Sequence, residues 1–251
     1  FSNPKPIELI TYFLGFGLTD NEIVMDFFSG SATTAEAVMR NNIGGNHNRF
    51  ILIQLPELID STKKATSENS KKVVLNAISV LDELKKPHYI TELAKERIRR
   101  AGKKIKEESP LTTQDLDTGF RVLKLDSTNM QDIYYSPKDI SQADLFSQVD
   151  NVKPDRTGED LLFQVMLELG ATLDSEIETT TVAGKTIYNV AEGYLVACFD
   201  PDVTDEVVKA IAQMQPAYAV LRDTSMKDDS TATNFEQIFK TYSPDTVTRI
   251  L

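Results

Sequence analysis

Two short apolar runs that flank a segment of small residues constrain this chain most. Residues 22–28 (EIVMDFF) and 50–55 (FILIQL) have the length and composition of short buried strands. Between them, residues 32–42 (ATTAEAVMRNN) predict a helix, with Thr33 and Glu36 at the spacing of a capping box. We therefore expect a strand, a tight turn, a helix and a second strand, which together form a parallel βαβ unit.

The turn at Gly30 has the parts of a nucleotide or adenosyl site. Ligands of open α/β sheets bind at the carboxyl ends of strands, and glycine lets the backbone come close to them. Asp26 can accept from an ammonium group, Phe27 or Phe28 can cover an aromatic ring, and the amides and threonine hydroxyls at the helix start can hold an anion. The alternative is a plain strand-to-helix turn with a core phenylalanine pair. The turn is neither a dinucleotide fingerprint nor a Walker loop, because G-x-G-x-x-G is absent and no G-K-[ST] follows it.

Further elements surround this unit in the first half of the chain. Pro6 suits the first turn of a helix that a following glycine can end. Residues 71–86 and 90–108 predict amphipathic helices, and residues 119–126 (GFRVLKLD) predict a strand that adds to the same sheet.

The second half predicts a smaller α/β layer structure. Its strands are expected within residues 175–200, with turns at AGK and AEG, and at 217–223 and 245–251. Its helices are expected at residues 158–170, 204–214 and 233–242. Because the stretch 127–156 is polar and rich in aspartate, we place the boundary between a domain of residues 1–126 and one of residues 127–251.

Charge and cysteine content narrow the function. The net charge of −11 argues against a surface devoted to nucleic acid, although a local basic patch is compatible with it. The single cysteine, Cys198, excludes an internal disulfide and fits a reducing cytoplasm. His47 and His88 lack metal-ligand spacing, so no metal is expected. No apolar run has the length of a bilayer span, so no membrane partner is expected either.

The helix expected at residues 90–108 is basic within an acidic chain. Its cationic residues are Lys95, Arg97, Arg99, Arg100, Lys103, Lys104 and Lys106. They can contact DNA phosphates or form a solvated helix face, and we favour the solvated face. No aromatic side chains interleave with these charges, so base stacking is not indicated.

Three motifs in a defined order resemble those of a known family. NPKP lies at residues 3–6, DFFSGSATTAEAVM at 26–39 and NRFILIQLPE at 48–57. Together they resemble the cofactor motifs of amino-group DNA methyltransferases, most closely those of the modification (Mod) subunit of type III restriction–modification systems. Further segments resemble the same subunits, so the likeness runs over nearly the whole chain; these segments are 91–105, 119–126, 155–165 and 220–240.

The resemblance implies a fold and an activity. The fold is a Rossmann-like S-adenosylmethionine-dependent methyltransferase sheet, present in part, followed by a smaller α/β domain for assembly. The activity is methyl transfer from S-adenosylmethionine to adenine N6 in DNA. The implied partners are DNA, a nuclease–helicase restriction subunit and a second copy of the protein.

The family's catalytic segment has no counterpart in this sequence. In the family an Asp-Pro-Pro-Tyr segment and the target-recognition region precede the N-x-K-P motif, whereas this chain starts at Phe1 and holds no Pro-Pro dipeptide. We therefore expect the chain to be the downstream part of a longer protein, to carry no catalytic residue of its own and to be inactive alone.

The resemblance also implies which residues bind the cofactor. They are Asn3, Lys5, Pro6, Asp26, Phe27, Phe28, Gly30, Ser31, Thr33 and Gln54. The chain departs from the family pattern at Ala32, where glycine is common, and at Gln54, where glutamate is common. The methyl of Ala32 narrows the backbone approach, and the amide of Gln54 accepts from ribose hydroxyls less strongly than a carboxylate does. Lys5 can instead be a solvated lysine before a helix.

Two other functions stay open from the sequence. The chain can be a small-molecule-binding α/β protein with another adenosyl ligand, which binding of NAD or ATP in place of S-adenosylmethionine would reveal. It can also be a non-catalytic module for dimerisation or restriction-subunit contact, in which the cofactor pocket is a relic. In that case S-adenosylhomocysteine would not raise the melting temperature.

Overall fold

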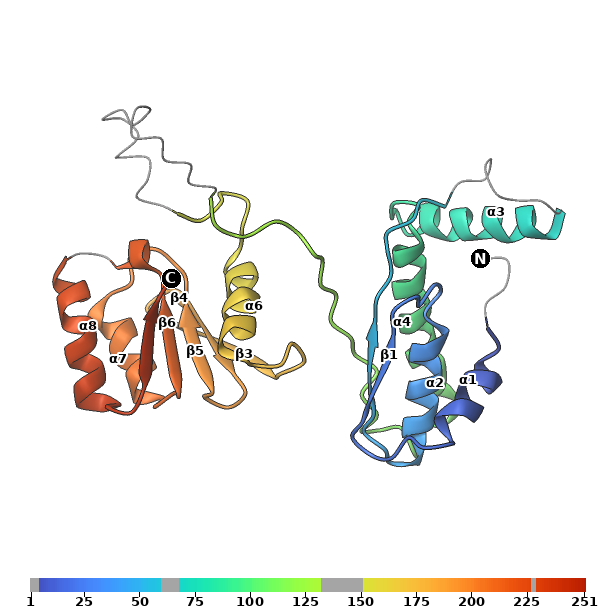
Figure 1. Ribbon diagram of the computed structural model, residues 1–251, viewed down its shortest axis with the longest axis horizontal. Coiled ribbons are helices and arrows are strands. Elements are labelled where there is room, and N and C mark those ends of the chain that lie inside the picture. The colour runs from blue at the N-terminus through green and yellow to red at the C-terminus, as the bar shows by residue number, and fades with distance from the viewer. Residues whose placement is uncertain (1–4, 60–67, 132–150, 227–228) are drawn as a thin grey trace. The chain divides into compact units, whose positions relative to one another are not determined.

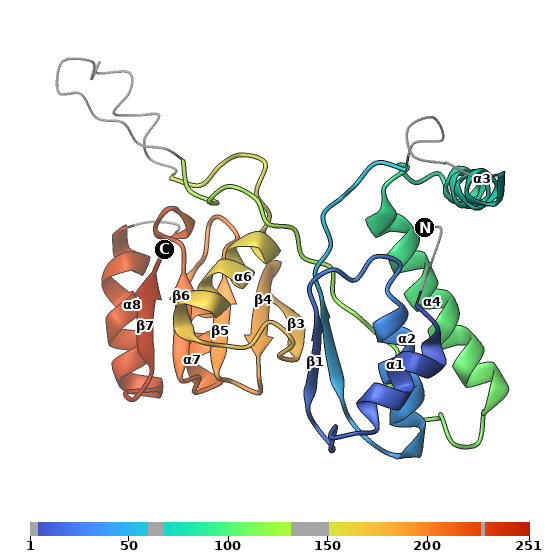
Figure 2. The same cartoon turned by 45° about the vertical axis from the view of Figure 1, so that its right-hand side comes forward.

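The computed structural model describes residues 5–59, 68–131, 151–226 and 229–251 (Figure 1). The chain divides into two compact units, Phe1–Arg121 and Val122–Leu251. The first contains a two-stranded sheet and the second a five-stranded sheet. Each sheet is packed against helices, so the chain has the α/β architecture that its sequence predicts (Figure 2).

The first unit contains the predicted βαβ arrangement. Its elements in chain order are α1 (Ile7–Leu14), β1 (Ile23–Asp26), α2 (Thr33–Asn41), the 3₁₀ turn η1 (Asn42–Gly44), β2 (Arg49–Leu52), α3 (Glu68–Glu83) and α4 (Ile90–Glu108). β1 and β2 pair in parallel, from Ile23 opposite Arg49 to Asp26 opposite Leu52. The helices expected after Pro6 and at residues 71–86 and 90–108 are all present.

The core of the first unit lies on one face of this small sheet. Met39 of α2 and Ile98 and Ile105 of α4 are buried there, against Phe50 and Leu52 of β2. Alternation along a strand sends every second side chain to the opposite face. That face stays open among the described residues.

The prediction that both strands are buried is therefore wrong, because their side chains alternate between exposed and half-buried. The open face carries Ile23, Met25, Ile51 and Ile53, each 45% to 54% exposed. The physical reason is that only two strands pair and the helices of the core cover only one face. Apolar composition predicted strands correctly, but burial depends on neighbours that a sequence pattern does not contain.

The strand predicted at residues 119–126 is not formed. The described backbone there has no strand pairing, and the side chain of Leu125 is fully exposed. Phe120 packs beside the core of the first unit, with the guanidinium carbon of Arg99 5.4 Å from its ring centroid. An apolar run becomes a strand only where a neighbouring strand takes up its backbone hydrogen bonds.

The second unit is a mixed sheet covered on both faces. Its elements are α6 (Gly158–Leu169), β3 (Ile177–Val182), β4 (Lys185–Val190), β5 (Leu195–Cys198), α7 (Asp205–Gln213), β6 (Tyr218–Leu221), the 3₁₀ turn η2 (Asp223–Ser225), α8 (Asp229–Tyr242) and β7 (Val247–Ile250). The strands lie in sequence order; β3, β4 and β5 are antiparallel, and β5, β6 and β7 are parallel. α6 packs on one face, and α7 and α8 pack on the other (Figure 2). All the helices and strands predicted for this half are present.

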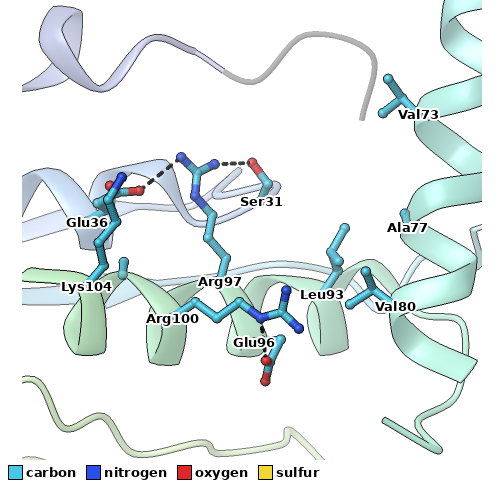
Figure 3. Close-up of a pocket in the computed structure, with 11 residues that line it drawn as sticks. Ser31, Glu36, Val73, Ala77, Val80, Leu93, Glu96, Arg97, Arg100 and Lys104 are labelled. Atoms are coloured by element: carbon cyan, nitrogen blue, oxygen red, sulfur yellow. Dashed lines mark hydrogen bonds and ion pairs between the residues drawn. The ribbon is translucent and has the colours of Figure 1, made fainter. Parts of the chain in front are cut away.

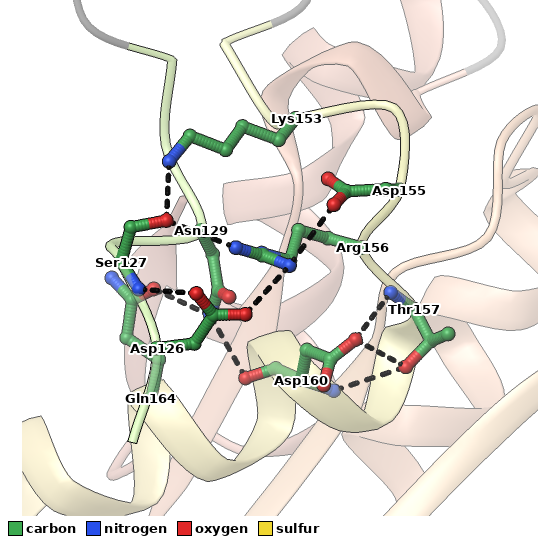
Figure 4. Close-up of polar contacts among 9 residues, drawn as sticks. All are labelled: Asp126, Ser127, Asn129, Lys153, Asp155, Arg156, Thr157, Asp160 and Gln164. Carbon is green, nitrogen blue, oxygen red and sulfur yellow. Dashed lines mark hydrogen bonds and ion pairs between the residues drawn. The ribbon is translucent and has the colours of Figure 1, made fainter. Parts of the chain in front are cut away.

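A cluster of polar side chains near the start of α6 links residues 126–129 with residues 153–164 (Figure 4). Nη1 of Arg156 lies 3.5 Å from a carboxylate oxygen of Asp126, and its Nη2 donates to Ser127 Oγ at 3.2 Å. Thr157 caps α6 in a capping box with Asp160. The pKa of the Asp160 carboxyl is lowered, chiefly because the backbone N–H of Thr157 donates to it.

Candidate functional site

The turn between β1 and α2 has the backbone conformation of a close-approach loop. Gly30 has a φ of +52° and Ala32 a φ of +61°, so two of three consecutive residues are left-handed. The amide of Ala32 donates to the carbonyl of Ser29 at 2.8 Å and closes the turn. Glycine adopts this conformation without strain, whereas an alanine methyl crowds the backbone there. The family departure at Ala32 thus falls on a residue whose backbone conformation favours glycine.

Asp26 and Gln54 brace the turn from the ends of the two strands. Thr34 Oγ1 donates to Asp26 Oδ2 at 2.6 Å, and the Phe28 amide donates to Asp26 Oδ1 at 3.2 Å. The Gly30 amide donates to Gln54 Oε1 at 2.8 Å, and Gln54 Nε2 donates to the carbonyl of Leu55. The structure therefore places Asp26 and Gln54 on the same turn: Asp26 binds Phe28 and Thr34, and Gln54 binds Gly30. With respect to the described part of the chain, Gln54 retains one amide hydrogen and a lone pair for a ligand.

The capping box predicted for Thr33 and Glu36 is not formed. The N-cap of α2 is Ala32, and no side chain caps the helix. Thr33 Oγ1 instead accepts from Arg97, and the Glu36 carboxylate pairs with Arg97 and Arg40. The spacing was correct for a cap, but a charged partner from a distant helix binds both groups.

Arg97 of α4 is the residue at this site that sequence reasoning did not select. Its Nη1 donates to Ser31 Oγ at 2.9 Å and to Thr33 Oγ1 at 2.8 Å, and its Nη2 lies 3.2 Å from Glu36 Oε2 (Figure 3). A signal was present: Leu93, Arg97 and Ala101 recur at helical spacing, which places Arg97 on the apolar side of α4. A cation on such a face requires polar partners.

Five of the other six cations of α4 pair with glutamates of the same helix, so the choice between a solvated face and DNA contact stays a prediction. Each partner is a glutamate three or four residues away: Lys95 with Glu92, Arg99 and Arg100 with Glu96, Lys103 with Glu107 and Lys104 with Glu108. Such pairs reduce the basic potential that would attract DNA phosphates.

The aromatic pair that follows Asp26 is exposed rather than buried. Phe28 is 85% exposed and Phe27 is 58% exposed, and their rings meet edge to face with centroids 5.4 Å apart. Within the described residues, the two phenylalanines therefore do not form the core pair of the alternative interpretation. An exposed aromatic face beside a braced turn is available to stack on a ligand ring.

The first motif is described only in part. Asn3 lies outside the described residues, while Lys5 and Pro6 are exposed at the start of α1. α1 packs against α2, which follows the turn. The hydrogen bonds that Asp26 and Gln54 make to the turn do not include Lys5, so its role as a cofactor ligand stays a prediction.

A groove of about 460 Å³ lies beside Arg97, between α3 and α4 (Figure 3). Val73, Ala77 and Val80 of α3 form an apolar wall, and Ser31 and Arg97 lie toward the turn. The groove adjoins the side of the turn that faces α4. The exposed ring of Phe28 is not among its lining residues.

Other chemistry finds no support in the part of the chain that the structure describes. There, no group of three histidine, cysteine or acidic side chains converges as metal ligands. Cys198 is buried in the second unit, and burial raises the pKa of its thiol, so it is not an activated nucleophile. Among the described helices, none combines the length and the apolar character needed to cross a membrane.

Comparison with known proteins identifies relatives that match the motif resemblance. The Mod subunit of the type III restriction–modification enzyme EcoPI from Escherichia phage P1 is 30% identical over 221 residues, which are 85% of this chain and 29% of the relative. The EcoP15I Mod subunit of Escherichia coli is 31% identical over 219 residues, 85% of this chain and 28% of the relative. The chain is homologous to type III Mod subunits. The family resemblance inferred from the motifs is thereby confirmed.

A third relative matches about half of the chain, and all three relatives are much longer than the chain. The StyLTI Mod subunit of Salmonella typhimurium is 33% identical over 122 residues, 48% of this chain and 16% of the relative. No family model matches the chain. The chain spans less than a third of the length of the Mod subunits it matches.

Proposed function

We propose that this chain forms part of a type III DNA methyltransferase, and that its braced turn receives the methionine end of S-adenosylmethionine. The observation that carries the proposal is that Asp26, at the end of β1, and Gln54, just after β2, each hydrogen-bond to the left-handed turn around Gly30. Parallel strands bind nucleotide-like ligands at their carboxyl ends. Homology to Mod subunits supports the same assignment.

Each group of the turn matches one part of the cofactor. The Asp26 carboxylate attracts the ammonium group, and the amides at the start of α2 attract the carboxylate with the help of the helix dipole. Phe28 offers its exposed face to the adenine ring, and Gln54 offers its remaining amide hydrogen to a ribose oxygen. When bound, the cofactor supplies a methyl group on a sulfonium sulfur.

Binding is tested by calorimetry with S-adenosylhomocysteine on the unchanged chain, against NAD and ATP. We expect S-adenosylhomocysteine to bind and to raise the melting temperature, and NAD and ATP to do neither. Asp26→Ala should abolish the shift. Asp20→Ala, an exposed carboxylate of the same unit that accepts from the His47 amide, is the matched control and should keep the shift. Equal binding of ATP would contradict the proposal.

Methyl transfer requires an acceptor side that this sequence lacks. A flipped adenine needs a stack and hydrogen bonds that align its amine, and the Asp-Pro-Pro-Tyr residues that supply them in the family are absent here. Since attack on the methyl group depends chiefly on positioning, the chain alone should transfer no methyl to DNA. Incorporation of tritiated methyl groups into cognate DNA by these 251 residues would contradict this expectation.

We assign the second unit to assembly within the same proposal. Helices cover both faces of its five-stranded sheet. Its described residues contain neither a cluster of metal ligands nor an activated thiol. The proposed partners are a second copy of the protein and the restriction subunit, while DNA is bound by the whole Mod protein. Chromatography with a restriction subunit of this family tests the assignment; co-elution that survives removal of the second unit would contradict it.

A further inference from the structure

Arg97 connects two parts of the first unit that lie far apart in the sequence. It belongs to the middle of α4, whereas Ser31 lies in the turn before α2 and Thr33 is the first residue of α2. Its side chain is 26% exposed, and its Nη1 lies within 2.9 Å of both hydroxyl oxygens. Ser31 and Thr33 are themselves buried, so water has little access to replace the guanidinium.

The hydrogen bonds from Arg97 determine how the two hydroxyls can act. Arginine carries donors only, so Ser31 Oγ and Thr33 Oγ1 both accept from it. Each hydroxyl hydrogen is then left to donate elsewhere. Two oriented donors beside the left-handed residues Gly30 and Ala32 suit an anionic group such as a carboxylate.

The charge of Arg97 is balanced within the same network. Glu36 is buried and pairs with Arg97 at 3.2 Å and with Arg40 at 3.3 Å, and Arg40 reaches Glu108 at 3.5 Å. An unpaired guanidinium would repel the cationic sulfonium of the cofactor. Pairing with Glu36 removes most of that repulsion and leaves the directional hydrogen bonds in place.

We propose that Arg97 is a positioning residue for the cofactor turn: it orients the Ser31 and Thr33 hydroxyls so that they donate to the carboxylate of S-adenosylmethionine. This inference rests on the proposed function of the turn. It assigns to α4 a part in cofactor binding that acts through the two hydroxyls and not through contact of Arg97 with the ligand. A forked guanidinium is required, because a lysine ammonium cannot serve Ser31, Thr33 and Glu36 in one fixed geometry.

The experiment measures the dissociation constant of S-adenosylhomocysteine by calorimetry. Arg97→Met should weaken binding about tenfold, the equivalent of one charge-assisted hydrogen bond. Arg97→Lys should recover only part of the loss. Arg100→Met is the matched control, since Arg100 lies on the same helix and lines the same groove but pairs with Glu96; it should change binding less than about twofold.

A double-mutant cycle separates positioning from a general effect on folding. In a Ser31→Ala/Thr33→Val background, Arg97→Met should have no further effect on the dissociation constant, because its route to the ligand is already removed. A tenfold loss in both backgrounds, or no loss in the first, would overturn the inference while the proposed function stands. Absence of binding by the unchanged chain would overturn both. Circular dichroism and melting curves of every variant confirm that the comparison is made between folded proteins.

Discussion

The two sheets of this chain differ in how completely they are covered. In the second unit, all four residues of β5 are buried between α6 on one face and α7 and α8 on the other. In the first unit, β1 and β2 alternate between half-buried and exposed residues, and the described helices of the core cover only one face. The second sheet holds its unit together, whereas the first serves mainly to place a turn.

This difference shows which kind of contact stabilises the candidate site. The second unit excludes water by stacking helices on both faces, so apolar burial stabilises it. The turn of the first unit is ordered by directional contacts instead: Asp26 and Gln54 from the strands and Arg97 from α4. Apolar residues on the open face, such as Met25 and Ile51, contribute little to the stability of the described fold because they keep much of their contact with water.

The largest expected effect tests this contrast between the cores. Leu195→Ala in β5 removes a fully buried side chain and should lower the free energy of unfolding of the second unit by about 2–5 kcal/mol. Ile51→Ala on the open face of β2 should cost about 0.5 kcal/mol or somewhat more in the first unit, because its side chain is 45% exposed. Urea titration followed by hydrogen exchange of each unit measures both. Equal losses would show that the open face is covered in solution.

A smaller expected effect compares two glycines with left-handed backbones, one in the candidate site and one outside it, in stability and in ligand binding. Gly30→Ala in the turn and Gly184→Ala between β3 and β4 should each cost about 1–2 kcal/mol, since both glycines have positive φ. Only Gly30→Ala should also weaken binding of S-adenosylhomocysteine, because its added methyl group would lie in the turn proposed to receive the cofactor. Gly17→Ala, which has open space around the added methyl, is the control for the first unit. Weaker binding in Gly184→Ala would contradict a site confined to the first unit.

The smallest effect concerns the pH dependence of the second unit. The pKa of Asp160 lies below its usual value of about 3.9, because the Thr157 amide and hydroxyl donate to the ionised carboxylate. A lowered folded-state pKa contributes stability above the unfolded value, and this contribution disappears as pH falls through the folded value. The difference in urea midpoint between the unchanged chain and Asp160→Asn should therefore shrink below about pH 4. Asp245→Asn, at an exposed site, controls for the loss of one negative charge; a constant difference would exclude the cap as the cause.

Local patterns predicted the strand, turn and helix around Gly30 better than they predicted burial. The strand, turn and helix around Gly30 were expected because their signals are local: a short apolar run, a glycine and then small residues at helical spacing. Burial of β1 and strand formation at residues 119–126 were wrongly expected, because both need a neighbouring strand or helix to cover or pair with them. Thr33 and Glu36 had the spacing of a capping box, but Arg97 binds both from α4.

Apart from the strand wrongly expected at residues 119–126, the sequence by itself determined the order of helices and strands, the position of the turn and the family to which the motifs point, since each depends on residues close together in the chain. Only the tertiary structure decided that Phe27 and Phe28 are exposed, that one face of the first sheet is open and that Arg97 holds the turn. The physical reason is distance along the chain. Contacts across some sixty residues arise from the packing of α4 on α2, and no short pattern specifies which side chain such packing brings to the turn.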